Sequence, residues 1–501
     1  MTVTSHQARS DAPLRRPDQF YIAGEWVAPS TTATIEVVDP TTEELYLRVA
    51  DAQPADMARA IAAARTAFDT GPWPGLTHAE RAGYLRAIAD GIRGRVDDAS
   101  GIWSREAGVV HRIARFSIGT LPAVYDYYAG LADDFPFAER ATPGGGGEYG
   151  LLVREPVGVV GAIVPWNAPM QLIAYKIAPA LLAGCTVVLK ASPEAPGGAY
   201  LMAEVAEAAG LPPGVLNVVT ADREVSELLV TDARVDKIAF TGSTAAGRRI
   251  ASLCGNRIAR YTLELGGKSA AVVLDDADLQ QTALALSRAE CFLSGQVCSS
   301  LTRIIVSRHR HDALLDALAA SFSAVRVGDP FEATTEMGPL SVRRQRDKVL
   351  GYIEQGKASG ATLAAGGGRP RHLDRGWFVE PTVFGNVDNS STIAREEIFG
   401  PVLTVIPVDD EAAAVRTAND TIYGLNASVF TDDVDRALAV ARQLRSGTVG
   451  HNDFRTDFGI GFGGFKQSGV GREGGRDGLL PYLESKTIIL NATPADARTE
   501  G

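Results

Sequence analysis

Apolar residues in the first third of the chain recur at the three- and four-residue spacing of a helix. Pro54 stands where the first residue of a helix is favoured, and one face behind it is apolar: Met57, Ile61, Ala64 and Phe68. A second helix is predicted to open at Thr77, because Glu80 follows three residues later and completes a capping box. Apolar residues again mark its inner face: Leu85, Ile88 and Ile92.

From residue 157 the pattern changes to short, wholly apolar runs that alternate with helical segments. Four runs have the length of buried strands: VGVVGAIV (157–164), CTVVLK (185–190), VLNVVT (215–220) and KIAFTG (237–242). Helical patterns lie between them at 169–183 and 199–209. Strands that alternate with helices predict parallel βαβ units and a doubly wound sheet.

The same alternation restarts after Gly267 and predicts a second α/β domain. A helix is expected to end near Val325, and the expected strands are 270–274, 302–307, Trp377–Val383, Val402–Val408 and Ala427–Thr431. The tail YLESKTIIL (482–490) is a strand without a neighbour in this series. It is expected to pair outside its own domain, and a pairing across a subunit boundary would satisfy it.

Composition and charge narrow the function classes. A chain of 501 residues, 45% hydrophobic and 22% charged, is too long for one core and predicts two or three domains. The net charge of −11 is spread along the chain without a basic patch, which argues against a nucleic acid partner. The apolar stretch 157–189 is broken by three prolines and carries Lys176, so a membrane span is not expected. An N-terminus without an apolar core segment favours the cytoplasm over secretion.

The four cysteines do not suggest a disulfide framework in a chain of this length. The sequence contains neither CxxC nor HExxH, so no metal site is expected. Cys298 lies among small or polar neighbours in FLSGQVCSS, whereas Cys185 lies within the apolar run LLAGCTVVL. Residue type alone still favours a structural cysteine at position 298, so a reactive thiol there needs further support.

Glycine motifs offer one candidate for phosphate binding. Three GxGxxG matches begin at Gly145, Gly459 and Gly469, but none follows an apolar strand and opens a helix, so all three are interpreted as loops. GGKS (266–269) lacks the first glycine of a P-loop. FTGSTAAG (240–247) directly follows a predicted strand, and its backbone amides suit a pyrophosphate, although an ordinary glycine turn is the alternative.

Seven segments together resemble the aldehyde dehydrogenase superfamily, and the resemblance covers nearly the whole chain. They are VPWNAP (164–169), LKASPEAP (189–196), FTGSTAAG (240–247), LELGGKS (263–269), GQVC (295–298), EEIFGPV (396–402) and FGGFKQSG (462–469). Each segment alone is weak, but their order and spacing match as a set. The resemblance implies oxidation of an aldehyde to a carboxylic acid with NAD(P).

In this resemblance Cys298 is the nucleophile that adds to the aldehyde and carries the thioester. Asn167 resembles the side-chain half of an oxyanion hole, with the Cys298 amide as the other half. Glu264 resembles the base that activates water to hydrolyse the thioester. Relatives that pass the acyl group to coenzyme A usually lack this glutamate, so hydrolysis to the free acid is favoured here. Lys176 and Glu473 resemble a proton exit behind Glu264, and a purely structural ion pair is the alternative.

The resemblance also implies a set of cofactor contacts. Trp166 and Lys190 face the adenosine, Gly242 and Ser243 the pyrophosphate, and Glu397 the nicotinamide ribose. The full set is Val164, Pro165, Trp166, Lys190, Ser192, Glu194, Gly242, Ser243, Leu265, Glu397 and Phe399. Many NAD-preferring members have an acid where this chain has Pro193. NAD is favoured here because Glu194 follows and this segment contains no additional arginine, and NADP stays open.

The implied substrate contacts are Ala168, Gln171, Tyr175, Phe292, Val297, Ser299, Arg455 and Phe458. Their aromatic rings suit a hydrophobic or aromatic aldehyde. Arg455 raises an alternative, because an inward guanidinium would hold the carboxylate of a semialdehyde. An outward Arg455 is a solvated or interface charge, and that orientation is preferred.

The implied fold is α/β, with a Rossmann-like cofactor domain (17–137 and 157–266), an α/β catalytic domain (267–478) and bridging strands (138–156 and 482–492). The bridge usually joins subunits, so a homodimer or homotetramer is expected. Two other function classes are disfavoured. A cofactor-independent cysteine hydrolase needs a base beside its nucleophile, and the Cys298 motif contains no histidine. An inactive structural paralogue is disfavoured because Cys298, Glu264, Asn167 and Glu397 are all present.

Overall fold

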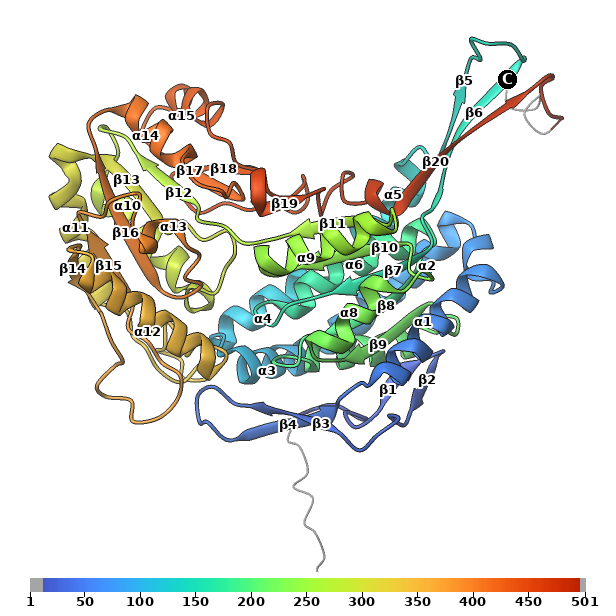
Figure 1. The fold of residues 1–501 in the computed structure, drawn as a ribbon, viewed down its shortest axis with the longest axis horizontal. Helices are drawn as coiled ribbons and strands as arrows, with labels where there is room; N and C mark the ends of the chain where they lie inside the picture. Colours follow the sequence, from blue (N-terminus) through green and yellow to red (C-terminus); the bar gives the residue numbers. More distant parts are fainter. Residues whose placement is uncertain (1–11, 496–501) are drawn as a thin grey trace, which may run out of the picture.

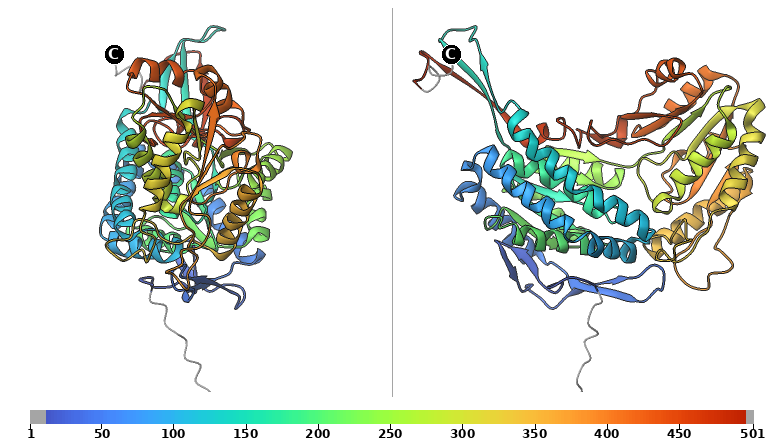
Figure 2. Two further views of the ribbon diagram at one scale, coloured as in Figure 1. Left: turned by 90° about the vertical axis from the view of Figure 1, so that its left-hand side faces the viewer. Right: turned by 180° about the vertical axis from the view of Figure 1, so that it is seen from behind.

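Two twisted sheets, each covered by helices, form the body of the molecule, and a narrow three-stranded sheet projects from it (Figures 1 and 2). The structure is a computed structural model that describes residues 12–495. The α/β fold predicted from the alternation of strands and helices is confirmed.

The first sheet has eight strands and a parallel centre. In spatial order these are β19 (Gly469–Val470), β11 (Arg260–Glu264), β10 (Lys237–Thr241), β7 (Val159–Ile163), β8 (Thr186–Ala191), β9 (Leu216–Thr220), β1 (Phe20–Ile22) and β2 (Glu25–Val27). The four central strands β7 to β10 are fully buried, which explains why they are apolar without alternation. The strand β19 is antiparallel and returns from the far end of the chain.

Nine helices belong to the N-terminal half of the described chain. They are α1 (Pro54–Asp69), α2 (His78–Arg93), α3 (Val96–Ala107), α4 (His111–Thr120), α5 (Pro122–Asp134), α6 (Pro169–Ala183), α7 (Gly197–Ala208), α8 (Arg223–Thr231) and α9 (Thr244–Asn256). The predicted start of α1 at Pro54 is confirmed, and so is the capping box of α2, in which Thr77 and Glu80 bond reciprocally.

The second sheet has seven strands, six of them parallel. They are β14 (Thr362–Ala365), β15 (Thr382–Gly385), β16 (Val402–Val408), β13 (Arg303–Ser307), β12 (Ala270–Val273), β17 (Asn426–Phe430) and β18 (Thr448–His451). Its helices are α10 (Leu279–Cys291), α11 (Arg308–Ser323), α12 (Arg343–Ala358), α13 (Thr392–Arg395), α14 (Glu411–Asn419) and α15 (Val434–Ala441).

The expected strand Trp377–Val383 is wrong over most of its length, because β15 begins only at Thr382. Trp377, Phe378 and Val379 are buried as predicted for a strand, but they pack as an extended connection. Pro381 lies directly before β15 and has no amide to donate to a neighbouring strand. The apolar run at 377–379 therefore predicted burial correctly, but it did not indicate a strand.

The remaining strands form two small sheets. β3 (Thr34–Val38) and β4 (Leu45–Ala50) make a hairpin. β5 (Ala138–Ala141), β6 (Tyr149–Pro156) and β20 (Leu483–Leu490) make the projecting sheet, which we call the arm (Figure 1). The tail strand predicted to pair outside its own domain is β20, and all eight of its residues pair with β6.

Candidate active site

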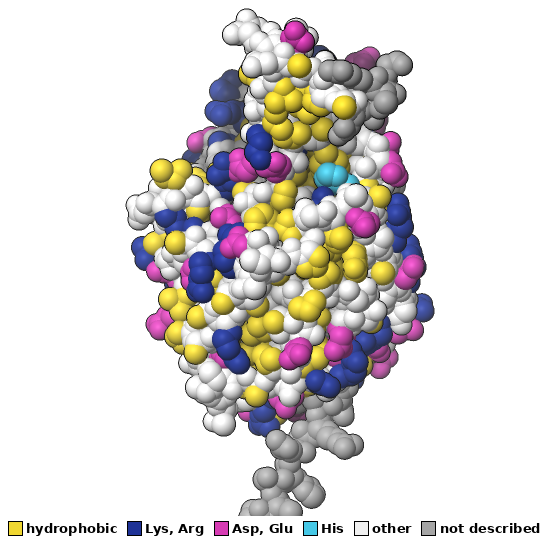
Figure 3. Space-filling model, turned by 90° about the vertical axis from the view of Figure 1, so that its right-hand side faces the viewer, with side chains coloured by type: hydrophobic (Ala, Val, Ile, Leu, Met, Phe, Trp, Pro, Cys, Tyr) yellow, Lys and Arg dark blue, Asp and Glu magenta, His cyan; other side chains and the backbone are white. Residues whose placement is uncertain are grey.

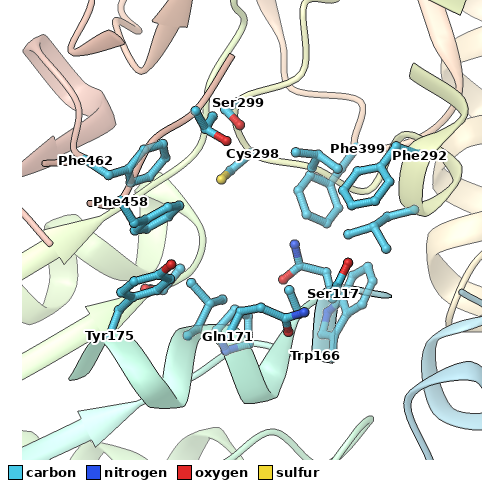
Figure 4. A pocket seen from close by; sticks show the side chains of 18 of the residues that line it. Ser117, Trp166, Gln171, Tyr175, Phe292, Cys298, Ser299, Phe399, Phe458 and Phe462 are labelled. Carbon is cyan, nitrogen blue, oxygen red and sulfur yellow. The ribbon is translucent and has the colours of Figure 1, made fainter. Parts of the chain in front are cut away.

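A cavity of about 710 Å³ is lined by residues from the domains of both large sheets, including α4. The first sheet contributes the loop between β7 and α6 and the end of β10, and the second contributes the Cys298 loop, α12 and the segment 454–462. Figure 4 shows Cys298 with its sulfur directed into this cavity. The cavity thus collects most of the predicted site residues from distant parts of the chain.

The loop that carries Cys298 is held in an unusual backbone conformation. Leu293 (φ 50°), Ser294 (φ 56°) and Gly295 (φ 71°) are consecutive left-handed residues, which costs about 1–2 kcal/mol for each residue that has a Cβ. The hydroxyl of Ser294 donates to the carbonyl of Gly338 at 2.9 Å. At Gly295 a Cβ would lie 2.3 Å from the carbonyl carbon of Gly400. Tertiary contacts therefore stabilise a turn that these residues would not adopt alone.

The side-chain amide of Asn167 is fixed beside the nucleophile loop. Its Nδ2 donates to the backbone carbonyl of Gln296 at 2.9 Å, and the backbone carbonyl of Asn167 accepts the indole N–H of Trp103 at 2.8 Å. Gln296 is held in turn, because its Oε1 accepts the amide of Ser341 at 3.0 Å. Asn167 and Cys298 are thereby brought to one point, as an oxyanion hole requires.

The surroundings of Cys298 favour the protonated form of its thiol. Burial raises the pKa of this thiol to about 12, and the nearby carboxylates of Glu397 and Glu264 raise it further. A thiol with such a pKa is a poor nucleophile until its proton is accepted by another group. The nearby carboxylates are the groups able to accept it.

Glu264 ends β11 with its side chain almost fully buried. Neither carboxylate oxygen has a hydrogen-bond partner within residues 12–495. Burial, followed by the charge of Glu473, raises its pKa well above the usual range of a glutamate. A raised pKa makes this carboxylate a stronger base than an ordinary glutamate, as suits a general base.

Lys176 and Glu473 form a buried ion pair whose charges both act on Glu264. The ammonium of Lys176 donates to Glu473 Oε1 at 2.6 Å and to the hydroxyl of Thr241 at 2.6 Å. The ion pair considered in the sequence is therefore present. Its part in proton transfer stays a prediction.

Glu397 lines the cavity, and its charge acts on the Cys298 thiol. Its Oε1 accepts the amide of Gly267 at 3.2 Å, and burial raises its pKa to about 7. Gln345 and Lys348 of α12 bond to the backbone of this segment: Gln345 to the carbonyl of Phe399 at 2.7 Å and Lys348 to that of Glu397 at 3.1 Å. Both α12 residues line the cavity and were missed in the sequence.

The segment Thr241–Gly242–Ser243 brings the N-terminus of α9 to the cavity. At Gly242 a Cβ would lie 2.5 Å from the ring of Phe240, so only glycine fits this approach. Backbone amides at the start of a helix suit a pyrophosphate. Leu265, Glu397 and Phe399 also line this part, so these residues fit a dinucleotide.

Four predicted cofactor residues lie outside the cavity lining. Val164 is buried, and its amide donates to the carbonyl of Lys190 at 3.3 Å, so it acts through the backbone of the sheet. Lys190, Ser192 and Glu194 lie at and beyond the carboxyl end of β8. Pro165 and Trp166 do line the cavity, and Trp166 contacts Phe399 edge to face with centroids 5.5 Å apart.

Three stacked rings cover the side of the cavity opposite Phe399; we call them the aromatic wall (Tyr175, Phe458 and Phe462; Figure 4). The centroids of Tyr175 and Phe458 are 4.1 Å apart, and those of Phe458 and Phe462 are 4.3 Å apart. A flat apolar surface of this kind suits a hydrophobic substrate chain.

A model of the aldehyde dehydrogenase family matches residues 26–488. The chain belongs to this family. It is 45% identical to a geranial dehydrogenase of Castellaniella defragrans over 94% of this chain and 98% of that protein. Two similar solved structures are an aldehyde dehydrogenase of Mycobacterium tuberculosis complexed with NAD+ (43% identity, TM-score 0.92, 94% and 98% of the two chains) and aldehyde dehydrogenase C of Pseudomonas syringae with NAD+ and octanal (39% identity, TM-score 0.91, 95% and 98%).

The predicted substrate contacts of this aldehyde dehydrogenase lie in the cavity lining with one exception. Those that line it are Ala168, Gln171, Tyr175, Phe292, Val297, Ser299 and Phe458. Arg455 does not line it: its side chain is 65% exposed and pairs with Asp453 at 3.3 Å. The prediction that Arg455 contacts the substrate is therefore wrong, and the outward orientation preferred from the sequence is the one observed.

Several lining residues of the aldehyde dehydrogenase site were not anticipated. Phe116 and Leu121, in and just after α4, line the cavity, and so does Phe462, which begins the motif FGGFKQSG but was not assigned to the substrate. Phe116 is exposed on α4, away from the buried positions Ala114 and Ile118, so periodicity did not mark it. Within residues 12–495 no helix could span a membrane, and no cluster of side chains suits a metal ion.

Proposed function

We propose that this aldehyde dehydrogenase oxidises a hydrophobic aldehyde to the carboxylic acid with NAD+, through a thioester on Cys298. The observation that carries the proposal is the convergence of the Asn167 amide, the Cys298 thiol and the orphaned carboxylate of Glu264. Relatives of known structure that bind NAD+ support the choice of cofactor.

The first step is addition of the Cys298 sulfur to the aldehyde carbon, with the thiol proton passing to a neighbouring carboxylate. The new alkoxide accepts hydrogen bonds from Asn167 Nδ2 and from the Cys298 amide. Bound NAD+ supplies the hydride acceptor, and loss of hydride from the carbon leaves a thioester. Trp166, Glu397 and Phe399 would hold the nicotinamide end, since they line the cavity beside Cys298.

The second step is hydrolysis of the thioester. Glu264 removes a proton from water, the resulting hydroxide adds to the acyl carbon, and the thiolate leaves as the carboxylic acid forms. The sum is one aldehyde, one NAD+ and one water converted to one acid, NADH and a proton. The Lys176–Glu473 pair supports transfer of that proton away from Glu264, because both charges act on it.

The aromatic wall supports a hydrophobic aldehyde as substrate. Tyr175, Phe458 and Phe462 offer stacked rings, and Arg455 lies outside the cavity lining, so a carboxylated substrate finds no support there. Geranial and octanal, the ligands named for two relatives, are both apolar aldehydes.

The test is the absorbance of NADH at 340 nm with purified protein and aldehydes of two to ten carbons, terpenoid and aromatic aldehydes, and a semialdehyde. We expect reduction of NAD+ with the longer apolar aldehydes and none in a Cys298→Ala variant. A folded protein that reduces neither NAD+ nor NADP+ with any aldehyde would overturn the proposal and restore the hydrolase and inactive-paralogue alternatives.

The arm is proposed to join two copies of the chain. Ile489 and Leu490 on β20 are exposed, and Figure 3 shows hydrophobic side chains gathered on the arm. Exposed apolar surface on a projecting sheet favours pairing with another chain. Light scattering should therefore give at least twice the monomer mass, and Ile489→Asp should lower the measured mass.

The four cysteines are free thiols, which supports the proposed cytoplasmic location.

A further inference from the structure

A second buried lysine lies on the same face of the first sheet as Glu264. Lys237 begins β10 and Thr241 ends it, so the two side chains project from the same face of the strand. Thr241 lies opposite Glu264 in the parallel register of β10 and β11, which places Glu264 on this face too. Lys176 donates to Thr241 from α6, so the Lys176–Glu473 ion pair covers the same face.

Lys237 is buried between two neutral partners. The residue is 1% exposed, and its ammonium donates to the hydroxyl of Thr262 at 2.6 Å. The ammonium also lies 5.0 Å from the ring centroid of Tyr482, the residue directly before β20. Neither partner carries a charge, so these contacts only partly replace the water that a charged ammonium loses. Burial accordingly lowers the pKa of Lys237 to about 7.

The titratable groups around Lys237 come from several elements. They are the thiols of Cys185 and Cys254, the carboxylate of Glu473 and the ammonium of Lys176. Burial raises the pKa of both thiols, so neither thiol is ionised near neutral pH. Glu473 is therefore the carboxylate whose negative charge acts on Lys237, although no direct ion pair joins them among residues 12–495.

Glu264 and Glu473 share these surroundings, and their charges repel each other. After burial, the charge of Glu473 raises the pKa of Glu264 most, whereas the charges of Lys176 and Arg472 lower it. Lys176 is already paired with Glu473, and Arg472 is only half-buried, so solvent screens its charge. Ionisation of both acids would leave a negative charge in a buried region, which is costly. A protonated Lys237 cancels that charge.

We infer that Lys237 is a positioning residue for the general base, because its ammonium is the buried counter-charge that allows Glu264 and Glu473 to be ionised together. The inference rests on the proposed function, in which Glu264 must be ionised before it can remove a proton from water. Lys237 does not line the cavity, so it acts on the reaction through charge and not through contact with the substrate. The alternative is a purely structural lysine that anchors Tyr482 at the base of the arm.

The experiment is the pH dependence of thioester hydrolysis in Lys237→Met, which keeps the length of the side chain and removes the charge. The protein is mixed with NAD+ and the best aldehyde of the panel. Mass spectrometry of acid-quenched samples gives the fraction of acylated Cys298, and NADH absorbance gives kcat. We expect the midpoint of the pH profile to rise by about one pH unit. Hydrolysis should then slow about tenfold at about pH 6.5 and approach the wild-type rate above about pH 9.

Two further variants of this contact keep the inference testable if Lys237→Met does not fold. Lys237→Arg retains the positive charge and should keep the wild-type pH profile. Thr262→Val retains the ammonium but removes its hydrogen-bond partner, so the charged form of Lys237 is less stable. Its profile should shift in the same direction as that of Lys237→Met, by a smaller amount.

The matched control is Lys466→Met. Burial also lowers the pKa of Lys466, to about 8, and its ammonium donates to the carbonyls of Asn419 at 3.0 Å and Thr421 at 2.9 Å. Its charge is not among those that act on Glu264, so the pH profile should stay that of the wild type.

A purely structural Lys237 would give a different result. If Lys237→Met folds and its midpoint lies within about 0.3 pH unit of the wild type, or its rate falls equally at every pH, the inference is overturned. A pH shift in Thr262→Val opposite to the expected one would also overturn it. A wild-type protein that forms neither acyl-Cys298 nor NADH would instead overturn the proposed function.

Discussion

Two groups of residues in the candidate site are built in different ways. Asn167, Cys298 and Glu397 of the first group line the cavity, and Glu264 lies outside its lining. The reactive cluster (Asn167, Glu264, Cys298 and Glu397) comes from four separate segments and consists of polar groups whose charge or orientation is set by burial. The aromatic wall comes from α6 and a single later segment and consists of stacked rings. The reactive cluster acts through individual polar atoms, so substitutions in it should change the rate of the reaction. The aromatic wall acts through apolar contact area, so substitutions in it should change which aldehyde is preferred.

The largest effect is expected from Glu264→Gln. Without the base the thioester forms but is not hydrolysed, so steady-state kcat should fall by about a thousandfold. Stopped-flow absorbance should still show a burst of about one NADH for each active site before turnover stops.

A matched control is Glu290→Gln. Glu290 is also buried, with its pKa raised to about 8, but its carboxylate accepts a hydrogen bond from the hydroxyl of Ser300, whereas neither oxygen of Glu264 has such a partner within residues 12–495. This variant should turn over without a burst. If the burst disappears together with turnover in Glu264→Gln, the role of Glu264 in the second step is wrong.

Asn167→Ala should lower kcat/KM by about 100- to 1000-fold, because one donor to the alkoxide is lost. The loss should be similar for every aldehyde, since each forms the same alkoxide. Initial rates on short and long aldehydes measure this. Gln171→Ala is the comparison, because Gln171 lines the cavity one turn later on α6, and its loss should differ from one aldehyde to another.

Phe458→Ala should remove the middle ring of the aromatic wall and change substrate preference. We expect kcat/KM to fall about 10- to 50-fold for octanal and less than about threefold for acetaldehyde, which is too short to cover the ring. Phe465→Ala serves as the control, because Phe465 is exposed and does not line the cavity. An equal loss for both aldehydes would assign Phe458 to the reaction itself.

The smallest expected effect is on the rate at which the Cys298 thiol is alkylated in protein without cofactor. Because the pKa of Cys298 is raised to about 12, the thiolate fraction is small at neutral pH, and alkylation by iodoacetamide should quicken about tenfold for each pH unit between 7 and 9. Glu397→Gln removes a negative charge that raises this pKa, so alkylation at pH 8 should be about threefold faster.

This difference should vanish at pH 6, where the Glu397 carboxyl, with a pKa of about 7, is already neutral in the unaltered protein. Mass spectrometry locates the label, and Cys298→Ala shows the background from the three buried cysteines. A pH-independent rate would contradict the protonated thiol.

Local patterns in the sequence were sufficient where one element determines its own structure. Pro54 and the Thr77–Glu80 box start α1 and α2 as predicted, and the apolar runs become the buried strands β7 to β10. The pattern failed at 377–381, where residues are buried without joining a sheet. Apolar side chains report burial, and burial does not require strand pairing.

The site was only partly predictable for the same reason. Motifs identified Cys298, Asn167 and Glu264 because each lies in a distinctive segment. Gln345 and Lys348 lie on α12, which resembles an ordinary charged helix in the sequence, and their roles arise from contacts with a segment 49 or more residues away. Such contacts leave no trace in the spacing of one segment.

The sequence by itself determined the α/β fold and the family, and it supplied the candidate reacting groups, because these depend on periodicity and on short motifs. Only the tertiary structure decided that Arg455 lies outside the cavity lining and that Arg344 of α12 pairs with Glu194. It also decided that burial raises the pKa values of Cys298, Glu264 and Glu397. Side-chain direction and pKa depend on what surrounds a group in space, and neighbours in space come from every part of the chain.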